Sequence, residues 1–314
     1  MRLAHLHLPP TIPFTHASHL QHILVSRLLS HKKLSDTSAS PSSPSFTHLP
    51  PAPDPTILTF TPNPVYTTGR RDLPSTTTST LDLPTPLHPI RHLLTSHPPR
   101  AEYHPTLRGG QTTYHGPGQL VAYTILDLRR LRLGPRQHIR LLERSVLDVL
   151  EDYGVKGGGV SEEPGVWVDQ RKHLGGGGVG EGDEELPKKI AAVGVHLRRY
   201  VSSYGVGLNV TEEPVWFLRQ IVACGLEGRE ATSLVGCEVD FGRNGKGEGE
   251  GEVMKEVAGR FVQAFVRRTN EVGTVRAVDA CCKGDERGEG EVRIKGVYSI
   301  GERDVLGDAD RGGR

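Results

Sequence analysis

Apolar residues recur with helical spacing in three stretches of the chain, residues 15–29, 135–153 and 253–267. The second stretch is the clearest, because Pro135 suits the first turn of a helix and Gly154 suits its end. Each stretch has one apolar face, so we expect each helix to cover a sheet. A shorter helix is predicted over residues 214–222.

Short runs of β-branched and apolar residues lie between these helices and predict strands. Residues 119–126 are apolar enough for a central strand, and residues 64–71 are interpreted as a turn. Strands, then a helix, then more strands favour an α+β (mixed α/β) fold over a regular βαβ repeat. The other predicted strands are residues 57–60, 165–168, 188–197 and 200–210.

Low-complexity segments interrupt this pattern. Only 35% of the 314 residues are hydrophobic, so the apolar sequence must be concentrated in part of the chain. We expect a single folded domain over residues 1–268 and a disordered tail over residues 269–314. Segments rich in Ser and Pro or in Gly are interpreted as insertions into the domain, near residues 35–55, 74–99, 171–187 and 242–252.

The charge and the cysteines exclude several classes of function. A formal net charge of +1 gives no global field that would attract nucleic acid or an anionic membrane. The apolar runs are too short to cross a bilayer, so a soluble protein is expected. The cysteines lack the spacing of a zinc site and are expected to be reduced thiols of an intracellular protein. They are Cys224, Cys237, Cys281 and Cys282.

Residues 108–119 combine four glycines and a proline with an arginine, a histidine and two glutamines. This composition disfavours both a helix and a continuous strand, so we expect an ordered loop held against the strand that follows it. His115 in this segment and His196 further on each fit a hydrogen-bonded structural histidine or a catalytic one, and the structural interpretation is the commoner.

Cys224 lies at the end of an apolar segment and is followed by Gly225, which frees the backbone to expose a thiol. The ordinary interpretation is an inert core residue. A nucleophilic role would require a neighbouring cation to lower the thiol pKa. Lys189, which opens an apolar strand, is one candidate, although on local sequence alone a solvated lysine is the simpler interpretation.

Five blocks, taken in order, change these interpretations, because the chain resembles the lipoyl(octanoyl) transferase family in all of them. It departs from the family pattern at Ala223, Tyr204 and Gly207, where the family usually has Pro, His and often Ala. None of these departures removes a catalytic atom. The blocks are RGGQTTYHGPGQLVAYTILDL from residue 108, GVWV from 165, KIAAVGVHL from 189, YGVGLNV from 204 and ACGLEGREATSL from 223.

The resemblance implies a biotin/lipoate ligase-like catalytic domain, in which a mixed sheet is flanked by helices. It implies an octanoyl thioester on Cys224, with Lys189 lowering the pKa of that thiol, and it requires no cofactor or metal. The residues that match the walls of the family's acyl pocket are Arg108, Gly109, Gly110, Gln111, Thr112, Thr113, Tyr114, His115, Ala192, Val193, Gly194, Gly205, Val206 and Gly207.

The partners implied are octanoyl-acyl carrier protein as donor and lipoyl domains as acceptors, namely E2 subunits of 2-oxoacid dehydrogenases and the glycine cleavage H protein. Two alternatives remain at this stage: an ATP-dependent lipoate-protein ligase on the same fold, and a non-catalytic protein that binds lipoyl domains or acyl carriers. The first acidic residue is Asp36, and such an acid-poor N-terminus favours a mitochondrial over a cytoplasmic location.

Overall fold

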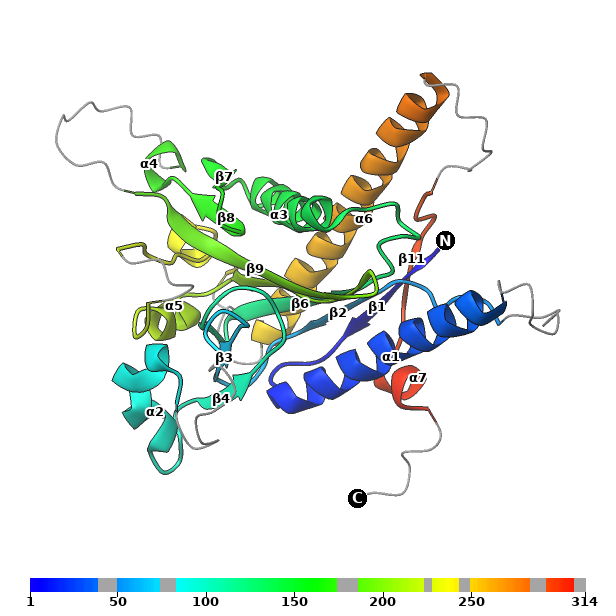
Figure 1. The fold of residues 1–314 in the computed structure, drawn as a ribbon. Helices are drawn as coiled ribbons and strands as arrows, with labels where there is room; N and C mark the ends of the chain where they lie inside the picture. Colours follow the sequence, from blue (N-terminus) through cyan, green and yellow to red (C-terminus); the bar gives the residue numbers. More distant parts are fainter. Residues whose placement is uncertain are drawn as a thin grey trace.

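The computed structural model describes residues 1–38, 50–73, 83–173, 186–222, 228–242, 249–282 and 292–307, with the side chains of residues 273–282 left aside. Within these ranges two sheets form the centre of the molecule, and helices cover the larger sheet on both faces (Figure 1). This arrangement confirms the predicted α+β fold with a mixed, helix-flanked sheet. Among the described helices, none is long and apolar enough to span a membrane.

The larger sheet has eight strands in the described part of the chain, in the order β11-β1-β2-β6-β10-β9-β8-β7. β1 is parallel to β2 and to β11, and the remaining neighbours are antiparallel. The strands are β1 (Leu3–His7), β2 (Thr56–Phe60), β6 (Gln119–Ile125), β7 (Gly158–Val160), β8 (Gly165–Val168), β9 (Lys188–Arg198), β10 (Val201–Asn209) and β11 (Val297–Ser299).

The smaller sheet has the order β4-β3-β5, with β3 (Val65–Thr68), β4 (Glu102–Pro105) and β5 (Thr113–His115). Two expectations are wrong here. Residues 65–68 form a strand where a turn was predicted, and the glycine-rich segment contains β5, because Thr113 and Tyr114 pair with Thr67 and Tyr66 of β3.

The central strand β6 is buried on both faces, which explains its unbroken apolar sequence. Leu120 and Ala122 face a core cluster shared with α3 (Pro135–Asp152) and α6 (Glu250–Cys282). Val121 and Tyr123 face the opposite cluster, which includes the apolar face of α1 (Phe14–Ser38). The three predicted long helices are therefore present, and they cover opposite faces of the sheet.

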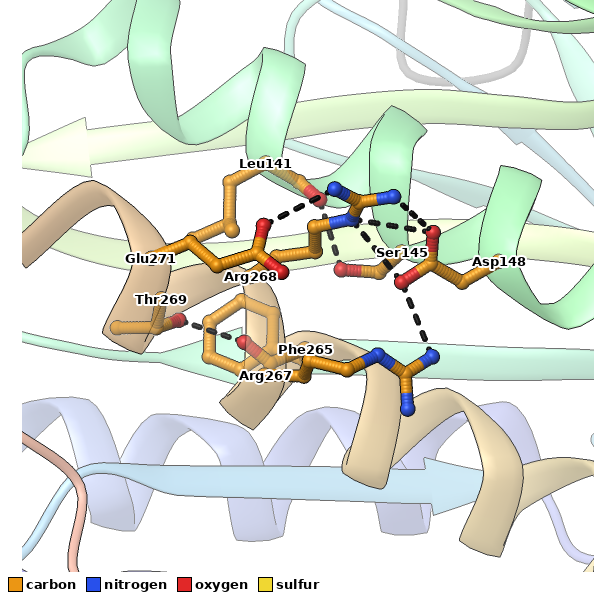
Figure 2. Close-up of polar contacts among 8 residues, drawn as sticks. All are labelled: Leu141, Ser145, Asp148, Phe265, Arg267, Arg268, Thr269 and Glu271. Carbon is orange, nitrogen blue, oxygen red and sulfur yellow. Dashed lines mark hydrogen bonds and ion pairs between the residues drawn. The ribbon is translucent and has the colours of Figure 1, made fainter. Parts of the chain in front are cut away.

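An ionic contact joins the two helices on one face (Figure 2). Asp148 of α3 is almost completely buried, and its carboxylate accepts hydrogen bonds from Arg267 Nη2 at 3.1 Å and from Arg268 Nε at 3.0 Å. Both arginines lie on α6. Together with the apolar contacts between α3 and α6, the ion pairs of Asp148 with these arginines fix how α6 crosses the sheet.

The predicted disordered tail is wrong for the described residues after 268. α6 continues to Cys282, β11 extends the sheet beside β1, and α7 (Glu302–Leu306) packs against α1. Ile294 and Val305 are buried, so this part of the chain contributes to the core. The acid-poor first residues likewise form β1 and α1 of the folded domain.

The segments interpreted as insertions are only partly described. Residues 85–95 are helical, as η1 (Thr85–Ile90) and α2 (Arg91–Thr95), because Leu87, Ile90 and Leu93 supply a buried face. Residues 39–49, 74–82, 174–185 and 243–248 lie outside the described residues. The remaining short helices are α4 (Gln170–His173), α5 (Glu213–Leu218) and η3 (Val235–Cys237), and α5 ends before the predicted residue 222.

Candidate active site

A cavity of about 240 Å³ lies between the glycine-rich segment and strands β9 and β10. Most of the predicted site residues line it. Cys224 lies outside the described residues, and Thr112 and Tyr114 do not reach the cavity. The predicted residues that line it are Lys189, Arg108, Gly109, Gly110, Gln111, Thr113, His115, Ala192, Val193, Gly194, Gly205, Val206 and Gly207.

The alternation of side chains along residues 112–115, which include β5, explains why Thr112 and Tyr114 do not line the cavity. Thr113 and His115 point to the cavity, whereas the Tyr114 ring stacks on Phe217 with centroids 4.3 Å apart. Thr112 donates from its backbone N–H to Asp72 Oδ2 at 2.7 Å. These two residues therefore hold the wall in place from behind.

Several lining residues were not predicted from the sequence. Their motifs carry no chemical signal, and only the fold brings them to the cavity. Tyr204 is one of the departures from the family pattern and is not among the predicted site residues. The unpredicted lining residues are Arg71, Tyr123, Ile139, Glu163, Pro164, Val195 and Tyr204.

Arg108 is a buried cation in the cavity wall. Its Nη2 donates to the Thr67 carbonyl at 2.9 Å and to Thr67 Oγ1 at 3.0 Å, which ties the glycine-rich segment to β3. The Gly109 N–H donates to the Val195 carbonyl at 2.9 Å and ties the same segment to β9. That N–H is therefore already used and does not serve as a donor to a substrate oxyanion.

A second cavity of about 210 Å³ adjoins the first, and the two share Thr113, Lys189, Ala192 and Gly207. Val222 and Gly228 also line it. These residues flank residues 223–227, which contain Cys224 and lie outside the described ranges. The chain thus leaves and re-enters the described structure at the wall of the cavity that Lys189 lines.

Lys189 is held by its backbone and by an aromatic ring. Its N–H donates to the Glu230 carbonyl at 2.8 Å, and its carbonyl accepts from the Thr232 N–H at 2.9 Å. Its ammonium Nζ lies 5.0 Å from the ring centroid of Trp167, its cross-strand partner on β8. A cation over an indole face is attracted by the ring quadrupole, so Trp167 orients the ammonium.

Lys188, the adjacent lysine, has a different environment. Its Nζ forms an ion pair with Glu230 at 3.0 Å, and Lys188 lines neither of the two cavities. Lys189 is thus the lysine of this pair that faces the cavities.

Gly165 makes room for the Lys189 side chain. A Cβ at this position would lie 2.5 Å from Lys189 Cε and 2.7 Å from the Ala191 carbonyl oxygen. Its φ of +144° is also a conformation that favours glycine. The glycine of the GVWV block is therefore required by the lysine on the next strand.

His115 is buried and its ring is neutral. Burial first, and then the positive charge of Arg108, lower the pKa of His115 to about 4. His196, the other histidine considered from the sequence, is half-buried on β9 and lines neither cavity. The structure does not bring His196 into the site.

The other cysteines give no second nucleophile in the described residues. Cys237 is buried, and burial raises the pKa of its thiol. A thiol that stays protonated in an apolar environment is a poor nucleophile. Cys281 and Cys282 belong to α6, where the structure describes only their backbone.

Comparison with known proteins identifies the family of the chain. The family model described as the lipoyl protein ligase A/B catalytic domain matches residues 45–235, more than half of the chain. A solved structure described as a "putative lipoate protein ligase" from Thermoplasma acidophilum, with bound lipoic acid, is 11% identical with a TM-score of 0.48 and covers 96% of this chain and 90% of its own.

Three curated relatives illustrate the sequence matches. "Probable octanoyltransferase" of Schizosaccharomyces pombe is 36% identical over 58% of this chain and 68% of its own length. "Octanoyltransferase" of Solibacter usitatus is 39% identical over 52% and 61%. "Putative lipoyltransferase 2, mitochondrial" of Drosophila melanogaster is 40% identical over 43% and 50%, so the matches span about half to two thirds of these relatives. The chain belongs to the lipoyl protein ligase A/B catalytic domain family and, within it, to the octanoyltransferases.

Proposed function

We propose that this protein transfers an octanoyl group from octanoyl-acyl carrier protein to a lysine of a lipoyl domain, through a thioester on Cys224. The observation that carries the proposal is the glycine-lined cavity with Lys189 at its junction with a second cavity. Residues 222 and 228, which flank the segment that contains Cys224, line the second cavity. The relatives named as octanoyltransferases support the same chemistry.

The chemistry needs no external energy source, because the donor thioester is already activated. The Cys224 thiolate attacks the octanoyl carbonyl carbon, and a C–S bond to the enzyme forms as the C–S bond to the carrier breaks. The carrier leaves as a thiolate, which takes up the proton that the Cys224 thiol released. The acceptor amine then attacks the same carbon, a C–N bond forms, and the electron pair of the broken C–S bond returns to Cys224. In this proposal Lys189 lowers the pKa of the Cys224 thiol and so raises the thiolate fraction at neutral pH.

The acyl chain is proposed to lie in the cavity between the glycine-rich segment and β9 and β10. Gly194 and Gly207 have neighbours close enough that a Cβ would meet Gly109 O at 3.1 Å and Gln119 Oε1 at 2.9 Å. A side chain at either position would collide with these neighbours, so glycine keeps the space between the glycine-rich segment and the two strands open. An acyl chain can therefore lie close to the backbone there.

The proposed acceptors are lipoyl domains of E2 subunits and the glycine cleavage H protein. The proposed location is mitochondrial, supported by the acid-poor N-terminus and by the mitochondrial relative of Drosophila melanogaster.

The test is transfer from octanoyl-acyl carrier protein to an apo lipoyl domain, with and without ATP. We expect octanoyl-lysine without ATP, and loss of transfer in Cys224→Ser. ATP-dependent modification from free octanoate that survives Cys224→Ser would instead identify a ligase. Tight binding of the carrier or the lipoyl domain without any turnover would identify a non-catalytic binding protein.

A further inference from the structure

Three buried side chains form a directed hydrogen-bond chain from the first cavity, which His115 lines, to the second cavity, which Gln119 and Asn209 line. Asn209 Nδ2 donates to the Thr232 carbonyl at 2.9 Å, and Gln119 Nε2 donates to Asn209 Oδ1 at 2.8 Å. Gln119 Oε1 lies 2.6 Å from His115 Nδ1. His115, Gln119 and Asn209 are 7%, 3% and 3% exposed, so the chain is shielded from bulk water.

The direction of this chain is set at its far end. A backbone carbonyl only accepts, so Asn209 must present its amide nitrogen to Thr232 and its oxygen to Gln119. Gln119 then presents nitrogen to Asn209 and oxygen to His115, and an amide oxygen also only accepts. The proton of His115 is therefore on Nδ1, and Nε2 carries a lone pair.

The lone pair on Nε2 is open to the cavity. His115 lines the cavity, and Nε2 has no hydrogen bond to any described residue. Some side-chain atoms, such as Tyr114 Oη and Trp167 Nε1, are fully buried and have no hydrogen-bond partner. His115 Nε2 is not one of these atoms, so it is accessible from the cavity. Arg108 and burial both oppose a second proton on the ring. The cavity thus contains a neutral hydrogen-bond acceptor of fixed orientation.

The octanoyl chain and its thioester carry no hydrogen-bond donor for this acceptor. The acceptor lysine has one, because it attacks as a neutral amine that carries two N–H bonds and a lone pair. A neutral imidazole that accepts one N–H leaves the amine lone pair free, whereas an imidazolium would donate to that lone pair and block it.

We propose that His115 Nε2 accepts an N–H of the attacking lysine amine and so turns the amine lone pair toward the thioester carbon, a role that rests on the proposed acyl transfer. Gln119 and Asn209 are positioning residues that fix the tautomer. The C–N bond forms as the C–S bond to Cys224 breaks, and the surplus proton of the amine goes to the released thiolate. His115 keeps a single proton throughout.

The two half-reactions, measured separately under single-turnover conditions, test this role. In His115→Met we expect acylation by octanoyl-acyl carrier protein to stay within about threefold of wild type, while transfer from the isolated octanoyl-enzyme to an apo lipoyl domain slows by about 10- to 100-fold. Gln119→Met, which leaves the tautomer unfixed, should slow the same step by a smaller factor.

Two further variants serve as controls. His115→Gln keeps a donor for Gln119 and an acceptor for the amine, so it should restore most of the transfer rate. His196→Gln changes a histidine outside both cavities and should leave both steps unchanged. Equal thermal midpoints for these proteins would show that folding is intact.

The outcomes separate this role from the proposed function. Equal slowing of both half-reactions in His115→Met would overturn the role, because the residue would then serve the acyl slot or the carrier arm. Unchanged transfer in His115→Met would overturn it as well. Failure of the wild-type protein to form any octanoyl-enzyme would overturn the thioester mechanism itself, together with the role of His115 that depends on it.

Discussion

Lys189 and Lys188 are adjacent in sequence, but their ammonium groups meet different surroundings. Lys189 lies over Trp167 between the two cavities, whereas Lys188 pairs with the Glu230 carboxylate. In a strand, successive side chains point to opposite faces, so the two lysines cannot substitute for one another. If Lys189 activates Cys224, the two lysines should differ sharply in mutational effect.

We therefore expect Lys189→Met to lower kcat/KM for octanoyl transfer by at least about 100-fold, the range usual for loss of a proton-transfer group. Lys188→Met, the matched control, should stay within about threefold of wild type. Steady-state kinetics at pH 7 measures both. Similar losses in the two variants would contradict the assignment of Lys189.

Gly165 gives a second test of the lysine's placement. Gly165→Ala should lower activity strongly and destabilise the fold by about 1–3 kcal/mol, because the added Cβ is strained at this φ and collides with Lys189 Cε. Gly159→Ala on the adjacent strand is the control, since a Cβ there meets nothing within 4 Å. Equal unfolding free energies for the two variants would show that the collision has no effect.

At the level of elements, one buried carboxylate reinforces the apolar contact between α3 and α6. Asp148 is 4% exposed and accepts hydrogen bonds from two arginines of the other helix. Asp148→Ala should lower the free energy of unfolding by about 2 kcal/mol, as expected for hydrogen bonds between charged groups. Urea unfolding followed by circular dichroism measures the change.

An exposed pair on α6 is the control for this prediction. Lys255 lies 3.8 Å from Glu252, and both side chains are largely solvated. Lys255→Ala should change the free energy of unfolding by less than about 0.5 kcal/mol. A comparable loss in the two variants would mean that Asp148 has no special role in joining the helices.

The elements that the sequence predicted well are those with long, regular patterns. The periodicity of α3 and the apolar run of β6 are visible without knowledge of the fold. β3 and β5 are four and three residues long, too short for a period to be recognised. β11 forms only because β1, almost three hundred residues away, provides its partner, so no local pattern could predict it.

The same distinction holds for the candidate site. Most residues that line the cavity could be predicted from the glycine-rich segment and from the five blocks that resemble the family. The hydrogen-bond chain from His115 to Thr232 could not be predicted, because its members come from separate strands and a later loop. The neighbours of Lys189 could not be predicted either, because Trp167 lies opposite Lys189 only through the register of β8 and β9.

At the scale of the whole molecule, buried neutral histidines make stability depend on pH. His138 is fully buried in α3 and shares a hydrogen bond with Thr124 Oγ1 at 3.2 Å. Burial lowers the pKa of His138 to about 4 from 6.5. The unfolded chain therefore binds a proton on His138 more tightly than the folded protein does. The stability that comes from a neutral, buried His138 is fully present above about pH 6.5 and is lost as the pH falls toward 4.

We predict that wild-type protein loses stability between pH 6.5 and 4, and that His138→Gln reduces the slope of this loss near pH 5 by about 1 kcal/mol per pH unit. Chemical unfolding at a series of pH values measures the slope. An unchanged slope in His138→Gln would show that this histidine already carries its proton in the folded state.

The central claim is that Cys224 carries the octanoyl group and that Lys189 activates it. The most direct measurement is mass spectrometry of the protein mixed with octanoyl-acyl carrier protein in the absence of ATP, followed by peptide mapping. We predict one octanoyl thioester, located on Cys224, absent from Cys224→Ser and formed much more slowly in Lys189→Met. A full octanoyl adduct on Cys224→Ser, or on any other residue of the wild-type protein, would contradict the account.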